Sequence, residues 1–169
     1  WVLPIPFEST TSYGAGTRDG PAAIITASRQ VEFYDRELDG EPALSMGIHT
    51  LNPLAMVHSS PKAMLAAIEE AVAKTLNGSP APQVLGILGG EHTITSGAGR
   101  GLARHCGTDD LVAVQIDAHA DLRDEYQGSR FSHACAARRI LETCPIFQVG
   151  VRSISAEEEH FRRGLRRVK

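Results

Sequence analysis

Two uninterrupted apolar runs limit the possible folds of this chain more than any other feature. Residues 84–88 read VLGIL and residues 111–116 read LVAVQI. A strand with one face in water alternates apolar and polar side chains, whereas a strand covered on both faces is apolar throughout. Both runs are therefore predicted to be strands of a parallel sheet with helices on both faces, in an α/β layer fold.

Helical patterns alternate with strands along the rest of the chain. The clearest helix opens at Pro61, and its apolar residues recur at helical spacing: Met64, Leu65, Ile68, Val72 and Leu76. Further helices are predicted over residues 21–34, 94–105 and 133–142 and from Ala156 onward, and further strands over residues 2–7, 43–51 and 146–151. The sequence shows no repeat or internal linker, so residues 1–169 are predicted to form a single domain.

Composition excludes several classes of protein. The 17 lysine and arginine residues and 20 aspartate and glutamate residues give a net charge of −3, which argues against a strongly basic nucleic-acid-binding protein. No apolar stretch approaches the ~20 residues that cross a bilayer, and no signal-peptide pattern opens the chain, so no membrane partner is expected. The three cysteines include no C-x-x-C pair, which favours a reducing, cytoplasmic location.

Ligand-type residues follow the second apolar run directly. Asp117, His119 and Asp121 form Asp-x-His-x-Asp, and side chains two residues apart in extended backbone point the same way. Ligands of open α/β sheets bind at the carboxyl ends of the strands. Two carboxylates and an imidazole there suit a divalent metal ion, although solvated loop residues or helix caps are the alternative. Burying three unpaired polar groups would be costly, which favours the metal site.

Two further histidines are candidates for the same site. His92 follows the first apolar run in the segment Gly89-Gly90-Glu91-His92. Because consecutive parallel strands are commonly neighbours, His92 is expected to meet the Asp117 cluster. His133 follows that cluster after a short charged loop, and a histidine beside a metal-bound water can carry protons. A simple hydrogen-bonded histidine is the alternative at each position.

Three motifs, in this order, make the chain resemble the ureohydrolases, the family of arginase and agmatinase, and agmatinase most closely. They are GGEH (89–92), DAHAD (117–121) and SHAC (132–135), and the loop 13–21 and the segment 148–155 add to them. The resemblance covers nearly the whole chain and implies a three-layer, arginase-like α/β fold with a mainly parallel sheet. It also favours close packing of the glycine-rich helix 94–105 on that sheet.

The resemblance also implies a hydrolase with two Mn²⁺ ions per complete active site. His92, Asp117 and Asp121 would bind one ion, and Asp117 would bridge to a second that His119 binds. A hydroxide held between the metals would attack the guanidinium carbon, with His133 as the proton shuttle and Glu91 orienting the ligands. The expected partners are a small guanidino substrate, most closely agmatine on the way to putrescine, and further copies of the chain in a homo-oligomer.

The chain departs from the family pattern after residue 155. The family carries a downstream Asp-x-Asp motif and a later glutamate, and this sequence has neither. The chain is therefore interpreted as a domain truncated at the C-terminus, with C-terminal strands missing, that binds metal weakly and turns over poorly. Its last glutamates are interpreted as an exposed helix start facing arginines: Glu157, Glu158 and Glu159, with Arg162, Arg163, Arg166 and Arg167.

Two other functions stay open at this point. One is a ureohydrolase for another guanidino substrate, such as a guanidinobutyrase-like enzyme. The other is a non-catalytic, truncated relic or scaffold that keeps some of the ligands. A thiol nucleophile at Cys135 is not expected, because His133 and Cys135 would point to different sides of a helix and cysteine is usually a small buried apolar residue.

Overall fold

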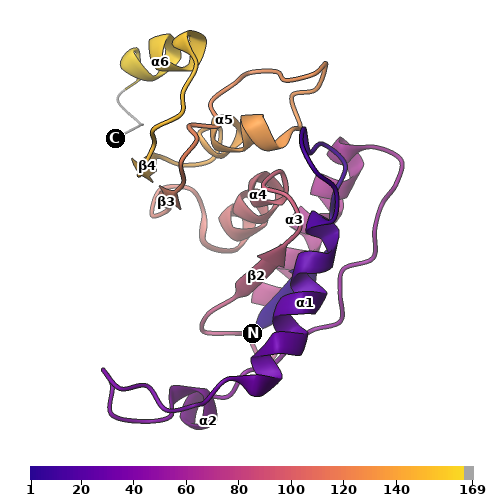
Figure 1. Cartoon of the computed structure of the whole chain (residues 1–169), viewed down its shortest axis with the longest axis vertical. Coiled ribbons are helices and arrows are strands. Elements are labelled where there is room, and N and C mark those ends of the chain that lie inside the picture. The colour runs from indigo at the N-terminus through magenta and orange to yellow at the C-terminus, as the bar shows by residue number, and fades with distance from the viewer. Residues whose placement is uncertain (166–169) are drawn as a thin grey trace.

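The structure, a computed structural model, describes residues 1–165 and places four strands in two parallel pairs. β1 (Val2–Ile5) pairs with β2 (Gly86–Gly89), and β3 (Ala113–Ile116) pairs with β4 (Ile146–Val149). All four residues of each strand are in register with the partner strand. Figure 1 shows α4 (Ile94–Cys106) between β2 and the β3–β4 sheet, so that a helix links the two pairs.

Helices make up most of the remaining regular structure. The other α-helices are α1 (Gly20–Ala27), α2 (Pro42–Met46), α3 (Pro61–Leu76), α5 (Ala136–Ile140) and α6 (Ala156–Arg163). Short 3₁₀ turns are η1 (Thr17–Asp19), η2 (Ser28–Gln30) and η3 (His133–Cys135). α3 begins where predicted, because the Ser60 hydroxyl accepts the Ala63 N–H at 3.1 Å and proline suits the first helical position. No helix among residues 1–165 is long and apolar enough to cross a bilayer.

The apolar side chains form two separate cores. The N-terminal core joins the predicted apolar face of α3 to β1 and its extension: Leu3, Ile5, Phe7, Met64, Leu65, Ile68, Val72 and Ile94. The C-terminal core joins the segment after β3 to α5 and β4: Ala120, Leu122, Ala137, Ile140, Leu141, Cys144 and Ile146. Each pair of strands therefore has an apolar core of its own. α4 contacts α3 of the N-terminal core and α5 of the C-terminal core.

The glycines of α4 allow close helix packing, as expected, but their neighbours are helices. A Cβ atom at Gly97 would lie 2.8 Å from the Leu65 carbonyl oxygen of α3, and one at Gly101 would lie 2.7 Å from Val72. Gly99 instead faces the Ile140 side chain of α5. The expectation that these glycines pack against the sheet was therefore wrong, because they pack against α3 and α5.

The predicted strand over residues 43–51 is also wrong. Residues 42–46 form α2, which ends at Gly47 with a positive φ of 75°, and only Thr50 makes a parallel bridge to Val2. Proline at the first position and glycine after the last explain why this apolar segment begins as a helix. The first predicted helix stops at Ala27, where the Ser28 hydroxyl donates to the Ile25 carbonyl and a 3₁₀ turn follows.

Two expectations about the central strands are contradicted. β2 and β3 do not pair with each other, and a pocket of about 200 Å³ lies between the start of α4 and β3. β3 and β4 are covered on one face only, because α5 packs against that face while side chains of the other face are exposed: Val114, Ile116 and Val149. The uninterrupted apolar run at 111–116 therefore does not correspond to burial on both faces within residues 1–165.

Candidate metal centre

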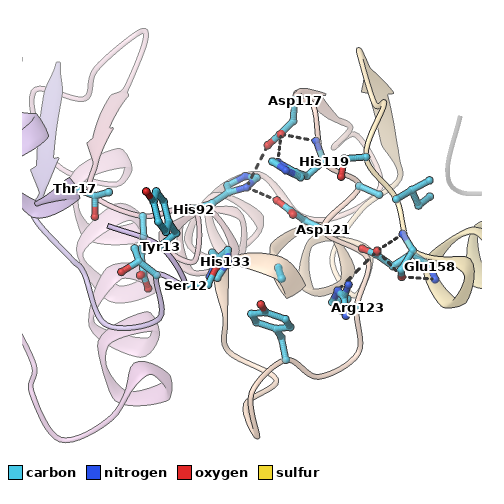
Figure 2. A pocket seen from close by; sticks show the side chains of 18 of the residues that line it. Ser12, Tyr13, Thr17, His92, Asp117, His119, Asp121, Arg123, His133 and Glu158 are labelled. Atoms are coloured by element: carbon cyan, nitrogen blue, oxygen red, sulfur yellow. Dashed lines mark hydrogen bonds and ion pairs between the residues drawn. The ribbon is translucent and has the colours of Figure 1, made fainter. Parts of the chain in front are cut away.

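The structure brings three of the predicted metal ligands together. The Nδ1 atom of His92 lies 2.7 Å from Oδ2 of Asp121 and 3.6 Å from Oδ2 of Asp117. One donor atom from each of the three side chains falls within 4.8 Å of the others. Figure 2 shows all three side chains pointing toward one another from different segments. One imidazole and two carboxylates at this spacing are a donor set that Mn²⁺ accepts.

A tight turn after β2 carries His92 to this point. The Gly90 N–H donates to the Ile5 carbonyl at 3.2 Å, and the Glu91 N–H donates to the Phe7 carbonyl at 2.9 Å. A Cβ atom at Gly90 would overlap the Phe7 carbonyl, so only glycine lets the two backbones approach this closely. The β1–β2 pair and the turn that follows it therefore fix the backbone position from which the His92 side chain projects.

The carboxylates come from a turn rather than from a continuing strand. β3 ends at Ile116, and Asp121 has a φ of 51°, in the left-handed region that a non-glycine residue rarely adopts. Neighbouring contacts hold that conformation, because the Asp121 carbonyl accepts the Arg138 N–H at 3.1 Å and the Leu122 N–H donates to Glu158 at 2.9 Å. Strained backbone of this kind concentrates at functional sites.

His119 lies on the other side of Asp117. Its Nδ1 atom is 3.5 Å from Oδ1 of Asp117, and its backbone N–H donates to the same oxygen at 2.8 Å. Asp117 thus presents Oδ2 toward His92 and Oδ1 toward His119, as Figure 2 shows. His119 is the most accessible of the four predicted ligands, with 66% of its side chain exposed.

Electrostatics favour the charged forms of this cluster. Burial by itself would lower the pKa of the His92 imidazole, but the hydrogen bond and charge of Asp121, with the charge of Asp117, raise it above its ordinary value. Burial would raise the pKa of Asp117, but hydrogen bonds from His119 and Gln115 and the nearby imidazoles lower it overall. A cation that binds there would compete with the proton of the His92 imidazole.

Gln115 is a polar residue of the apolar run that the sequence analysis did not single out. It is 9% exposed, and its side-chain amide donates to Oδ2 of Asp117 at 3.4 Å. Across the sheet, the Gln148 amide donates to Oε1 of Gln115 at 2.7 Å. This pair of glutamines orients the carboxylate that lies between the two histidines.

His133 lines the same pocket as the ligand cluster. The pocket has a volume of about 550 Å³, and its wall includes His92, Asp117, Asp121 and His133. His133 Nδ1 lies 3.4 Å from the Thr10 hydroxyl, and Nε2 lies 3.4 Å from the Ser12 hydroxyl. Residues of the loop after β1 form the facing wall, and the sequence analysis gave none of them a role in the site: Thr11, Ser12, Tyr13 and Thr17.

Glu91 has a different role from the one expected. Its carboxylate, on a residue only 5% exposed, accepts hydrogen bonds from Ser9 N–H at 3.2 Å, Thr10 N–H at 2.8 Å and the Thr10 hydroxyl at 2.9 Å. These contacts tie the loop after β1 to the turn after β2. Glu91 therefore orients the pocket loop, and these hydrogen bonds of its carboxylate go to Ser9 and Thr10 rather than to the metal-ligand side chains.

The interpretation of the glutamates at the start of α6 was wrong for Glu158. Glu158 is buried, closes a capping box with Ser155 and accepts the Leu122 N–H. The surface ion pairs belong to Glu159, which contacts Arg162 at 2.8 Å and Arg163 at 2.7 Å. The predicted partners at 166 and 167 lie outside the described residues. The Ser-x-x-Glu spacing at 155–158 is the signal that could have identified Glu158.

Cys135 has the properties of a buried structural residue. Its relative exposure is 0%, and burial raises the pKa of its thiol. A nucleophilic cysteine needs a lowered pKa and access to substrate.

Comparison with known proteins gives relatives with ureohydrolase names. The chain is 40% identical over 163 residues to the N(1)-aminopropylagmatine ureohydrolase of Synechocystis sp., covering 93% of this chain and 52% of that protein. It is 39% identical over 163 residues to the agmatinase of Pyrococcus horikoshii, covering 95% and 54%. The chain thus spans about half the length of the curated relatives it matches.

Solved structures give the same fold. The agmatine ureohydrolase of Thermoplasma volcanium superposes with a TM-score of 0.82 at 31% identity, over 99% of this chain and 55% of that one. The arginase of Medicago truncatula superposes with a TM-score of 0.84 at 23% identity, over 96% and 53%, and so supports the fold alone. The predicted arginase-like α/β fold is confirmed. Residues 1–169 match the Arginase family in full, and the chain therefore belongs to the arginase family.

Proposed function

We propose that this chain contributes a metal site to a manganese-dependent ureohydrolase that hydrolyses a guanidino compound, most closely agmatine, to urea and an amine. The observation that carries the proposal is the convergence of His92, Asp117 and Asp121 from two separate sheets on one point. The agmatinase and aminopropylagmatine ureohydrolase names of the relatives support a guanidino substrate.

The residues have complementary roles in this proposal. His92, Asp117 and Asp121 would hold one Mn²⁺, and Asp117 and His119 would contribute to a second. When bound, the metals would supply a water of lowered pKa and would stabilise negative charge on the guanidino group. His133, on the wall of the same pocket, carries the proton to the leaving amine. The backbone contacts of Asp121 and the Gln115 bond to Asp117 keep the carboxylates aimed at the pocket.

Titration with Mn²⁺ tests the metal site in this chain. We expect saturable binding that Asp121→Asn or His92→Asn weakens strongly and that Asp110→Asn, a matched change at an exposed carboxylate before β3, leaves intact. Absence of saturable Mn²⁺ binding would contradict the proposal and favour the scaffold alternative.

A substrate panel tests the second part of the proposal. Urea release with added Mn²⁺ is expected to rank agmatine above 4-guanidinobutyrate and arginine. A preference for 4-guanidinobutyrate would assign the chain to the alternative guanidinobutyrase-like class. Rapid turnover by the chain alone would show instead that residues 1–169 contain a complete catalytic set.

A further inference from the structure

The loop that forms one wall of the metal pocket has no buried residue at its centre. Every residue from 12 to 19 is exposed, and Tyr13 is 99% exposed. Figure 2 shows Ser12, Tyr13 and Thr17 on one side of the pocket and the carboxylates of Asp117 and Asp121 on the other. Apolar packing therefore does not hold this wall in place, and polar contacts at its two ends must do so.

Glu8 holds the end of this loop that leads into α1. Its Oε2 atom accepts the Gly16 N–H at 2.7 Å and the Thr17 hydroxyl at 2.8 Å, and the Arg18 N–H donates to the same atom at 3.1 Å. The hydrogen bonds from Thr17 and Arg18 lower the pKa of Glu8, so its carboxylate is ionised at neutral pH. Hydrogen bonds to an ionised carboxylate are about twice as strong as those between neutral groups.

Glu91 holds the other end of the loop, and both carboxylates start from well-anchored backbone. Glu91 accepts the N–H groups of Ser9 and Thr10. Glu8 follows Phe7, which is 3% exposed in the N-terminal core, and the Phe7 carbonyl accepts the Glu91 N–H at 2.9 Å. The β1–β2 pair therefore holds the loop at both ends, and the exposed segment between these ends carries the residues that face the metal ligands.

We propose that Glu8 is a positioning residue that, together with Glu91, fixes the loop 9–18 as the pocket wall against which the substrate is held. The inference rests on the proposed function, which places the guanidino substrate in this pocket. Glu8 acts through the loop, because its hydrogen bonds go to residues 16–18, whereas the Ser12 hydroxyl lies 3.4 Å from Nε2 of His133. Removing the Glu8 carboxylate should therefore loosen this wall and leave the metal ligands in place.

Nuclear magnetic resonance of the ¹⁵N-labelled, metal-free chain tests the anchor. In the wild type, the amide proton of Gly16 should shift as Glu8 titrates, with a midpoint below the ordinary glutamate pKa, and Glu8→Gln should abolish this titration. Glu8→Ala should speed hydrogen exchange at Gly16 and Arg18 about tenfold, as the loss of one hydrogen bond to a charged group does. Glu8→Gln keeps an acceptor oxygen and should give an intermediate rate.

Urea release with added Mn²⁺ tests the consequence for the substrate. Glu8→Ala should raise KM for agmatine about fivefold and change kcat less, because a loosened wall must be ordered again when the substrate binds. Its Mn²⁺ affinity should stay within about twofold of the wild type, as expected for separate sites. Glu32→Ala, at an exposed glutamate outside the loop, is the matched control and should change neither value.

Unchanged hydrogen exchange at Gly16 and Arg18 in Glu8→Ala overturns the proposal, as does faster exchange with an unchanged KM. A large loss of Mn²⁺ affinity also overturns it, because Glu8 would then support the metal ligands rather than the loop. If Glu8→Ala does not fold, the Gly16 titration in the wild type and in Glu8→Gln decides. If the wild type binds no Mn²⁺ or releases no urea, the proposed function fails, and the amide measurements still decide whether Glu8 holds the loop.

Discussion

The two sheets of this molecule are built from similar strands but are covered differently. Around β1 and β2, α3 buries a continuous apolar surface, and Ile5, Leu65 and Ile68 are fully inaccessible. Around β3 and β4, α5 covers one face, while Val114 is 63% exposed on the other. Apolar sequence alone therefore does not report burial, because burial depends on which elements pack against each face.

The candidate metal centre joins these two regions. His92 follows the well-covered sheet, and Asp117 and Asp121 follow the half-covered one. A His92–Asp121 contact of 2.7 Å joins the two at this point. A metal ion there would act as a clamp between regions that have separate cores.

Removing the central carboxylate should have the largest effect. Asp117→Asn removes the charge of the residue between His92 and His119. We expect a loss of Mn²⁺ affinity of more than about 100-fold, which exceeds the loss typical of changes to residues that only hydrogen-bond to the metal ligands. Calorimetric titration measures it, with Asp110→Asn as the control. Equal losses in the two variants would mean that general charge, rather than the cluster, attracts the ion.

The same substitution in both regions tests the difference in burial. Val72→Thr places a hydroxyl in the N-terminal core, where Val72 is 2% exposed, and should lower the free energy of unfolding by about 1–3 kcal/mol. Val114→Thr is isosteric on the exposed face of β3 and should change it by less than about 0.5 kcal/mol. Urea denaturation gives both values. A large loss in Val114→Thr would mean that something covers that face in solution.

Local features of the fold were predictable from sequence, and non-local ones were not. α3 and α4 follow from helical periodicity and from the Pro61 start, since both signals lie within a few residues. Strand order depends on contacts far apart in the chain, and β2 therefore pairs with β1 rather than with β3. Proximity of His92 to Asp117 was reached through an assumed β2–β3 pairing, whereas α4 and the turn at Gly90 produce it.

The candidate site shows the same division. Its carboxylates and histidines stand out in sequence because residue types that bind metals follow two apolar runs, and three of them are spaced two residues apart. Thr10 does not, since a threonine in a polar loop carries no signal of its distance to His133. Glu158 had a local signal in its capping box, but its bond to Leu122 depends on the docking of α6 onto a segment 36 residues away.

Close packing of α4 on α3 gives a smaller, graded prediction. Gly97→Ala gains up to about 1 kcal/mol of helix propensity, but its Cβ would meet the Leu65 carbonyl, which cannot move without shifting α3. We expect a net loss of about 1–2 kcal/mol in the free energy of unfolding. Gly99→Ala is the control, because its neighbour is the end of the flexible Ile140 side chain. A stabilised Gly97→Ala variant would show that the two helices have room to separate.

The smallest effect belongs to an ion pair on the surface of α6 and depends on pH. The hydrogen bonds of Arg162 and Arg163, with their charges, lower the pKa of Glu159 from 4.5 to about 2. Because the folded-state pKa is the lower one, this ion pair stabilises the fold above pH 4.5, and the contribution disappears as the pH falls toward 2. Glu159→Gln should therefore be slightly less stable than the wild type at neutral pH and equal to it near pH 2. Urea denaturation across this range measures the difference, with the exposed neighbour Glu157→Gln as the control. A difference between Glu159→Gln and the wild type that persists at pH 2 would place the contribution of Glu159 in packing of its side chain rather than in its charge.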